Sequence, residues 1–104
     1  MHKIVLCCQH GASTDLLANK MMEAAEKLGL DVAVEAYPYT SLEKVIDQAA
    51  VVLIAPQIRF KEKTFKAKYA DKGVPFLLVE PSDYGLLRGE KVLKQCLAAI
   101  GEEV

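Results

Sequence analysis

The stretch KIVLCCQHGASTDLL, residues 3–17, predicts the first unit of the fold. Residues 4–7 form a continuous apolar run, which is typical of a buried strand. Gly11 then interrupts the pattern, and from about Thr14 onward apolar residues recur at helical spacing. We therefore expect a strand, a glycine loop and a helix in succession, with Cys8 at the point where the strand becomes the loop.

Cys8 would lie beside the amino end of that helix. The first backbone N–H groups of a helix have no partner within it, and the helix dipole is positive there, so an anion in the loop meets several aligned donors. The same field favours a thiolate over a thiol, which makes Cys8 a candidate nucleophile. The six residues after it are candidate phosphate-binding groups: Gln9, His10, Gly11, Ala12, Ser13 and Thr14.

Strands and helices alternate along the rest of the chain. Further strands are predicted at 31–37, 50–55 and 74–79, and helices at 14–28, 40–48, 58–72 and from Ser82 or Leu86 to Ile100. Strands that are apolar throughout, rather than at every second residue, are typical of a parallel sheet with helices on both faces. The sequence therefore predicts a single α/β domain, residues 1–104, built on a four-stranded parallel sheet.

Local patterns add detail to these elements. The segment 40–43 has the capping-box pattern, with Thr40 as the helix cap and Glu43 reaching back to it. Pro75 is compatible only with the beginning of a strand or with an edge strand. Core-facing side chains are expected at Leu17, Met21, Ala25 and Leu28 in the first helix, at Phe65 and Tyr69 in the third, and at Val92, Leu93, Cys96, Leu97 and Ile100 in the last.

Three segments should meet at one edge of this sheet. Segments 8–13, 56–60 and 81–85 each follow a predicted strand, and the carboxyl ends of parallel strands lie together. Ligands of such sheets bind beyond these carboxyl ends. The edge that carries Cys8 is therefore the expected functional site.

Composition excludes several other classes of protein. A chain of 104 residues with 52% hydrophobic content can bury the core of one domain. Its net charge of −1 does not indicate nucleic-acid binding, and no apolar run approaches the roughly 18–20 residues of a membrane span. Three cysteines, two of them adjacent, do not form a disulfide framework. We expect a cytoplasmic protein that does not enter the membrane.

The loop residues together resemble those of a known family. The chain carries Cys8-x-x-Gly11-x-Ser13-Thr14-x-Leu16-Leu17, then Ala55-Pro56-Gln57, then Tyr84-Gly85, each set after a predicted strand. This order resembles the lactose/cellobiose-type enzyme IIB of the bacterial phosphoenolpyruvate-dependent sugar phosphotransferase system, over essentially the whole chain. The resemblance implies strand order 2-1-3-4 and a fold similar to that of low-molecular-weight tyrosine phosphatases.

The resemblance also implies a function. Cys8 would accept a phosphoryl group from a phosphohistidine of the partner enzyme IIA and pass it to a sugar of the cellobiose, chitobiose or lactose type, held by the membrane permease IIC. No metal or cofactor is implied, and the chain would be a monomer on its own. Residues expected at the partner interface are Pro56, Gln57, Ile58 and Tyr84.

A small phosphatase or arsenate reductase is the nearest alternative. Low-molecular-weight phosphatases have the pattern Cys-x5-Arg, whereas Thr14 stands at the arginine position here. Hydrolysis also needs an acid for the leaving group, and Asp83 is the obvious acidic candidate. A third possibility is a binding or regulatory domain whose cysteine loop does not turn over.

Other chemistry-bearing residues have simpler interpretations. Cys7 and Cys96 are expected to pack in the core, and Cys7, Cys8 and His10 lack the spacing of a closed zinc site. Asp15 is expected to point outward, while His10 either stabilises an anion or faces solvent. Segment 59–72 holds six basic and two acidic residues, a local charge of +4, which indicates a solvated helix face or docking to an acidic partner.

Overall fold

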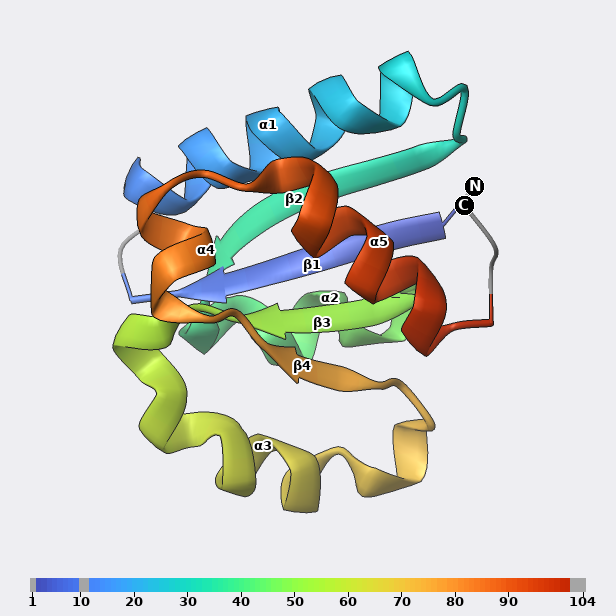
Figure 1. Ribbon diagram of the computed structural model, residues 1–104. Coiled ribbons are helices and arrows are strands. Elements are labelled where there is room, and N and C mark those ends of the chain that lie inside the picture. Colours follow the sequence, from blue (N-terminus) through green and yellow to red (C-terminus); the bar gives the residue numbers. More distant parts are fainter. Residues whose placement is uncertain (1, 10–11, 102–104) are drawn as a thin grey trace.

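The computed structural model describes residues 2–9 and 12–101. Within these residues, one sheet is formed by β1 (His2–Cys8), β2 (Val32–Pro38), β3 (Val51–Ile54) and β4 (Phe76–Leu78). All of its pairings are parallel, and the order across the sheet is β2-β1-β3-β4 (Figure 1). The predicted four-stranded parallel sheet and its order 2-1-3-4 are confirmed.

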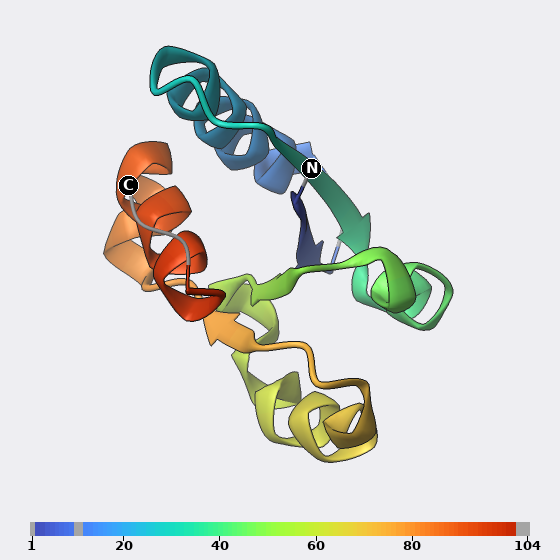
Figure 2. The same cartoon turned by 90° about the vertical axis from the view of Figure 1, so that its right-hand side faces the viewer.

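Helices cover both faces of the sheet (Figure 2). One face carries α1 (Ala12–Lys27) and α5 (Gly89–Ala99), and the other carries α2 (Leu42–Val45) and α3 (Glu62–Lys68). The short helix α4 (Pro81–Gly85) follows β4. Short 3-10 turns occur at η1 (Tyr39–Ser41), η2 (Ile46–Gln48), η3 (Pro56–Lys61) and η4 (Ala70–Lys72).

Each face of the sheet has its own buried cluster. Ile4 and Leu6 of β1 belong to the cluster under α1 and α5, whereas Val5 and Cys7 belong to the opposite cluster with Phe65 of α3. Alternate residues of one strand therefore enter different clusters, and both sets are fully buried. This two-sided burial explains why the strand is apolar at every position.

The predicted helix at 58–72 is wrong in its extent. Regular α-helix is confined to α3, and the turn before it is broken at Ile58, whose φ of −117° and ψ of 26° are not helical. Gly73 ends the segment with a φ of +69°, as its position suggested. Phe65 and Tyr69 do face the core, each about 7% exposed, so the inward pattern is confirmed although the helix is shorter.

The last helix, predicted from Ser82 or Leu86 to Ile100, is divided into α4 and α5, so the start at Ser82 is wrong and the start at Leu86 is three residues too early. Leu87, with a φ of +52°, turns the chain between α4 and α5. The turn brings Gly89 onto the backbone of Lys20 and Met21, where a Cβ on Gly89 would lie 2.5 Å from the Lys20 carbonyl carbon. The direction of α5 is therefore set by this close contact with α1, which the spacing of apolar residues along the chain does not reveal.

Two smaller expectations are also wrong. Helical structure begins at Tyr39, so Thr40 lies inside a turn, and neither Pro38 nor Ser41 caps a helix with its side chain. Leu28 is 39% exposed because α1 ends at Lys27 and the chain turns away through Gly29 at a φ of +70°.

The strand predicted at 74–79 is shorter, since β4 covers only Phe76–Leu78; Pro75 directly precedes this strand, which is an edge strand as its proline allowed. No helix in the described part of the chain is long and apolar enough to cross a membrane.

Candidate functional site

The carboxyl ends of β1, β3 and β4 lie at one edge of the sheet (Figure 1). Cys8 ends β1, η3 begins two residues after β3, and α4 begins three residues after β4. The predicted meeting of segments 8–13, 56–60 and 81–85 is therefore confirmed for the parts that the structure describes. Two of the three segments are short helical turns rather than open loops.

Cys8 sits at the transition between strand and loop. It is paired in register with Pro38 of β2, and its side chain is only 4% exposed. The Cys8 thiol donates a hydrogen bond to the Tyr37 carbonyl oxygen, with an Sγ–O distance of 3.6 Å. A thiolate cannot donate, so the sulfur loses this contact when it becomes a nucleophile.

The amino end of α1 lies just beyond Cys8 in the chain. The helix begins at Ala12, four residues after Cys8, so the positive end of its dipole lies on the side of the cysteine. Gln9 is exposed, whereas the Thr14 side chain is fully buried. His10 and Gly11, two of the predicted phosphate-binding residues, lie outside the described residues. Asp15 is exposed, as expected.

The predicted interface residues differ in burial. Gln57 is exposed, and Pro56 and Tyr84 are half-buried, so all three offer surface near the site. Ile58 is fully buried in the cluster under α3, because its non-helical backbone turns the side chain toward the core. The interpretation of Ile58 as an interface residue is therefore wrong, and its role is to anchor η3.

Three exposed apolar side chains in the segments that follow β1, β3 and β4 were not predicted from the sequence. Leu16 of α1 is 55% exposed, Phe60 of η3 is 67% exposed, and Leu86 just after α4 is 64% exposed. They follow the carboxyl ends of β1, β3 and β4 by eight, six and eight residues. The only signal in the sequence was their position outside the core-facing stripes. Exposed apolar groups around a site are typical of a protein docking surface.

Asp83 is held in an ionic clamp. The side chain is fully buried, and its Oδ1 accepts hydrogen bonds from Lys91 Nζ at 3.1 Å and Arg88 Nη1 at 3.2 Å. Burial alone would raise the pKa of Asp83, but the hydrogen bonds and charges of Lys91 and Arg88 outweigh it and lower the pKa below its usual value. Asp83 is therefore a carboxylate at neutral pH and a poor proton donor.

Burial makes the remaining two cysteines poor nucleophiles at neutral pH. Burial raises the pKa of both the Cys7 and the Cys96 thiol to about 12, and in Cys7 the charge of Cys8 adds to the effect. Their predicted packing in the core is confirmed. Among the described residues, no three His, Cys, Asp or Glu side chains gather as metal ligands.

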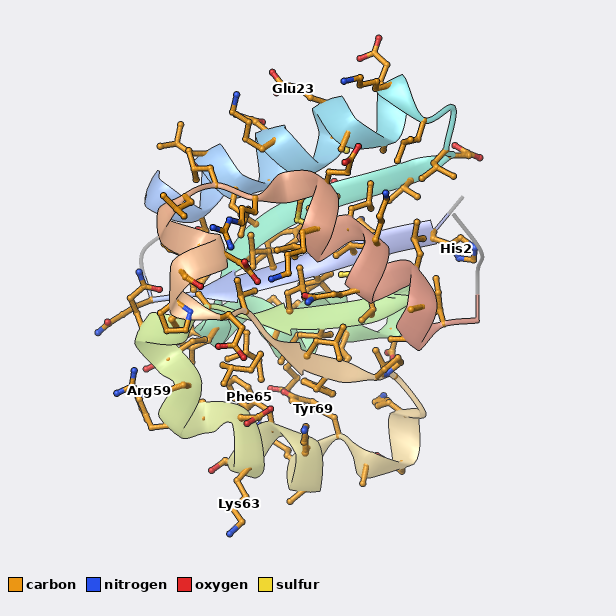
Figure 3. The ribbon with its side chains drawn as sticks, viewed as in Figure 1. His2, Glu23, Arg59, Lys63, Phe65 and Tyr69 are labelled. Carbon is orange, nitrogen blue, oxygen red and sulfur yellow. The ribbon has the colours of Figure 1, made fainter. Side chains whose placement is uncertain are left out.

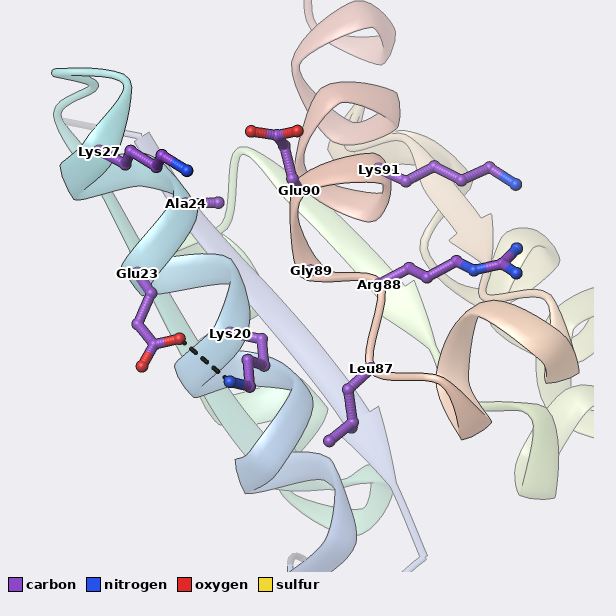
Figure 4. A pocket seen from close by; sticks show the side chains of 9 residues that line it. All are labelled: Lys20, Glu23, Ala24, Lys27, Leu87, Arg88, Gly89, Glu90 and Lys91. Atoms are coloured by element: carbon purple, nitrogen blue, oxygen red, sulfur yellow. Dashed lines mark ion pairs between the residues drawn. The ribbon is translucent and has the colours of Figure 1, made fainter.

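A groove of about 500 Å3 lies elsewhere, between α1 and the start of α5 (Figure 4). Lysine, arginine and glutamate side chains line it together, and Lys20 pairs with Glu23 at 3.5 Å. Its mixed charges and its place along the helix junction separate it from the edge that carries Cys8.

Comparison with known families gives one match to nearly the whole chain. The model of the family described as "PTS system, Lactose/Cellobiose specific IIB subunit" matches residues 3–95. Among curated proteins, the galactose-specific EIIB component of Lactococcus lactis subsp. cremoris is 34% identical over 95 residues, covering 86% of this chain and 88% of that protein. The oligo-beta-mannoside-specific EIIB component of Bacillus subtilis is 30% identical and covers 94% of this chain and 95% of its own.

Solved structures agree with this result. The solution structure of the cellobiose-specific IIB component from Borrelia burgdorferi has a TM-score of 0.81 at 35% identity, covering 95% of this chain and 91% of that one. The lactose-specific IIB domain from Streptococcus pneumoniae has a TM-score of 0.85, covering 93% of this chain and 95% of its own. At 20% identity, this second likeness speaks for the fold alone.

Proposed function

Because the chain belongs to the lactose/cellobiose-specific IIB family of the sugar phosphotransferase system, we propose that it carries a phosphoryl group on Cys8. The donor is a phosphohistidine of a IIA protein. The acceptor is a sugar bound by a IIC permease at the cytoplasmic face of the membrane. Members of this family act as phosphotransferases in sugar phosphorylation, and the proposal adds the residue and the partners.

The position of Cys8 is the observation that carries the proposal. Cys8 is the described cysteine that stands at the carboxyl edge of the sheet, immediately before the loop that leads into α1. The dipole at the amino end of α1 favours an anion such as a phosphoryl group on Cys8. Cys7 and Cys96 are excluded from the role by complete burial and raised pKa values.

The chemistry requires positioning more than functional groups. In the first step, the S–P bond to Cys8 forms while the N–P bond of the phosphohistidine breaks, and in the second, the O–P bond to the sugar forms while the S–P bond breaks. Neutral backbone donors stabilise the charge on the transferred group in both steps. A carrier must also release its phosphate, and Thr14 in place of an arginine avoids a strong bidentate pair.

The exposed apolar side chains supply a docking surface for the partners. Leu16 and Leu86 lie in the segments that follow β1 and β4 and are 55% and 64% exposed. Since a single cysteine faces both donor and acceptor, we expect IIA and IIC to use this surface in turn. A relative from Streptococcus mutans named a lactose-specific EIICB component, 32% identical over 89 residues, supports the link to a permease.

The phosphatase alternative is disfavoured by Asp83. A hydrolase needs an acid that can protonate the leaving group. The clamp of Lys91 and Arg88 keeps the one candidate ionised and buried. Thr14 also stands at the position where such an enzyme has the arginine whose guanidinium binds the phosphate.

The test is the intact mass after incubation with phosphorylated IIA. The protein should gain one phosphoryl group, and the gain should disappear in Cys8→Ser. Cys7→Ser and Cys96→Ser are the matched controls and should remain phosphorylated. A phosphate mapped to His10, or retained in Cys8→Ser, would show that the proposed carrier residue is wrong.

A further inference from the structure

Segment 59–72 forms a basic patch: Arg59, Lys61, Lys63, Lys66, Lys68 and Lys72. The segment carries a charge of +4 in a chain whose net charge is −1, so the rest of the chain carries −5. Every member except Lys61 is exposed. The molecule is therefore strongly polarised, with its positive charge gathered on η3, α3 and η4.

Most of this charge is not compensated within the fold. Lys66 pairs with Glu62 at 3.2 Å and Lys72 with Asp47 at 2.8 Å. In the described part of the chain, Arg59 and Lys63 form no ion pair, and both point away from the sheet (Figure 3). On the same segment, Phe65 and Tyr69 are the buried side, so the charges occupy the opposite, outer side.

Phe60 lies within this patch and is 67% exposed. Arg59 and Lys61 flank it in the chain, and Lys61 Nζ lies 6.0 Å from the Phe60 ring centre and 5.3 Å from that of Tyr39. An exposed aromatic side chain among cations is typical of segments that rest in the headgroup region of a membrane. The cations meet lipid phosphates while the ring enters the apolar boundary.

We propose that the basic patch and Phe60 bind anionic lipid headgroups of the membrane that holds the permease. The loops of a permease on this side are themselves rich in Lys and Arg, so they do not complement the patch, whereas the lipid surface around them is negative. η3 begins two residues after β3, at the edge that carries Cys8. A membrane that holds η3 therefore keeps Cys8 close to a membrane-embedded acceptor.

The experiment is sedimentation of the full chain with vesicles of phosphatidylcholine, with or without phosphatidylglycerol. Binding should require phosphatidylglycerol and should be lost when NaCl rises from about 0.15 M to about 1 M, since the Debye length falls from about 8 Å to about 3 Å. The double variant Arg59→Glu/Lys63→Glu should bind at least about tenfold more weakly. Arg59→Gln/Lys63→Gln should lose less, and circular dichroism checks that each variant is folded.

The matched control is Lys27→Glu/Lys94→Glu, which changes the net charge equally on exposed positions of α1 and α5. It should bind nearly as well as the unmodified chain. Equal losses in both double variants would mean that net charge alone acts, and absent binding to phosphatidylglycerol vesicles would overturn the proposal. If vesicles do not bind but Arg59→Glu/Lys63→Glu slows phosphoryl uptake from IIA, the patch serves an acidic protein instead.

The inference uses the proposed function only to name the membrane concerned. Cys8→Ser should bind vesicles as the unmodified chain does, because Cys8 lies outside the patch. If phosphoryl transfer to Cys8 fails, the vesicle measurement still tests the lipid proposal. If the protein is phosphorylated but does not bind anionic vesicles, only the lipid proposal is refuted.

Discussion

The three cysteines place the same side chain in different surroundings. Cys7 in β1 and Cys96 in α5 are fully buried among apolar neighbours, which raises each thiol pKa to about 12. Cys8 follows Cys7 directly and is itself only 4% exposed, but it lies at the end of the strand, next to exposed Gln9. The two cysteines therefore share a buried cluster, and they differ in that Cys8 stands where the chain leaves the sheet.

Iodoacetamide at neutral pH should therefore label Cys8 before Cys7 or Cys96, by about tenfold or more in rate, because reactivity follows thiolate content and access. Peptide mass mapping after short exposures of the folded protein gives the three rates. In denaturant the rates should converge, since burial is lost. Equal labelling of the folded protein would contradict the assigned difference between the cysteines.

Asp83 makes stability depend on acid pH. Its pKa is lowered in the folded state, so the unfolded chain binds a proton first as the pH falls. The stabilisation is present above the ordinary aspartate pKa of about 3.9 and is lost as the pH drops below it. Asp83→Asn should melt several degrees lower at pH 7 and should lose less on acidification, as thermal melts across this range can show. Asp71→Asn, at an exposed carboxylate, is the control and should behave like the unmodified chain.

At the level of elements, strands were easier to predict than helix boundaries. Continuous apolar runs identify β1 and β3 because both of their sides are buried. The breaks at Ile58 and Leu87 depend instead on contacts with distant segments, such as the packing of Gly89 against Lys20. Helical periodicity continues across such breaks, so the sequence predicted single helices where the structure has two elements.

Gly89 of α5 lies against the backbone of α1 with no room for a Cβ. A Cβ there would lie 2.5 Å and 2.7 Å from backbone atoms of Lys20 and Met21, which cannot move independently of α1. We expect Gly89→Ala to lower the free energy of unfolding by about 1–3 kcal/mol through overpacking. Urea denaturation measures this difference.

Gly85→Ala is the matched control for this prediction. No atom lies within 4 Å of a Cβ at Gly85, so the same change adds a methyl group without a clash. Its effect should stay within about 0.5 kcal/mol. A similar loss in both variants would point to backbone conformation rather than to the α1–α5 contact.

For the whole molecule, the sequence predicted the parallel sheet and the edge at which Cys8 lies, because these follow from chain order and the geometry of parallel strands. It did not predict the exposure of Leu16, Phe60 and Leu86, since periodicity indicates which residues can be buried but not which remain uncovered. The clamp on Asp83 also escaped prediction. Its partners are five and eight residues away, across the turn at Leu87, and a regular helix would not bring all three together.

The ion pairs of Asp83 with Arg88 and Lys91 affect how fast the phosphorylated protein should lose its phosphate. Hydrolysis here lacks both the proton donor and the arginine guanidinium that a phosphatase provides. A histidine of docked IIA can still accept the phosphoryl group. We expect spontaneous loss of phosphate to be slower than back-transfer to unphosphorylated IIA by about a hundredfold or more. Isolated phosphoprotein can be followed by intact mass with and without IIA.

Asp83→Asn should leave the spontaneous rate of phosphate loss unchanged, because a carboxylate held by Lys91 and Arg88 donates no proton. Decay as fast as back-transfer, or p-nitrophenyl phosphate turnover abolished by Asp83→Asn, would favour a phosphatase over a carrier.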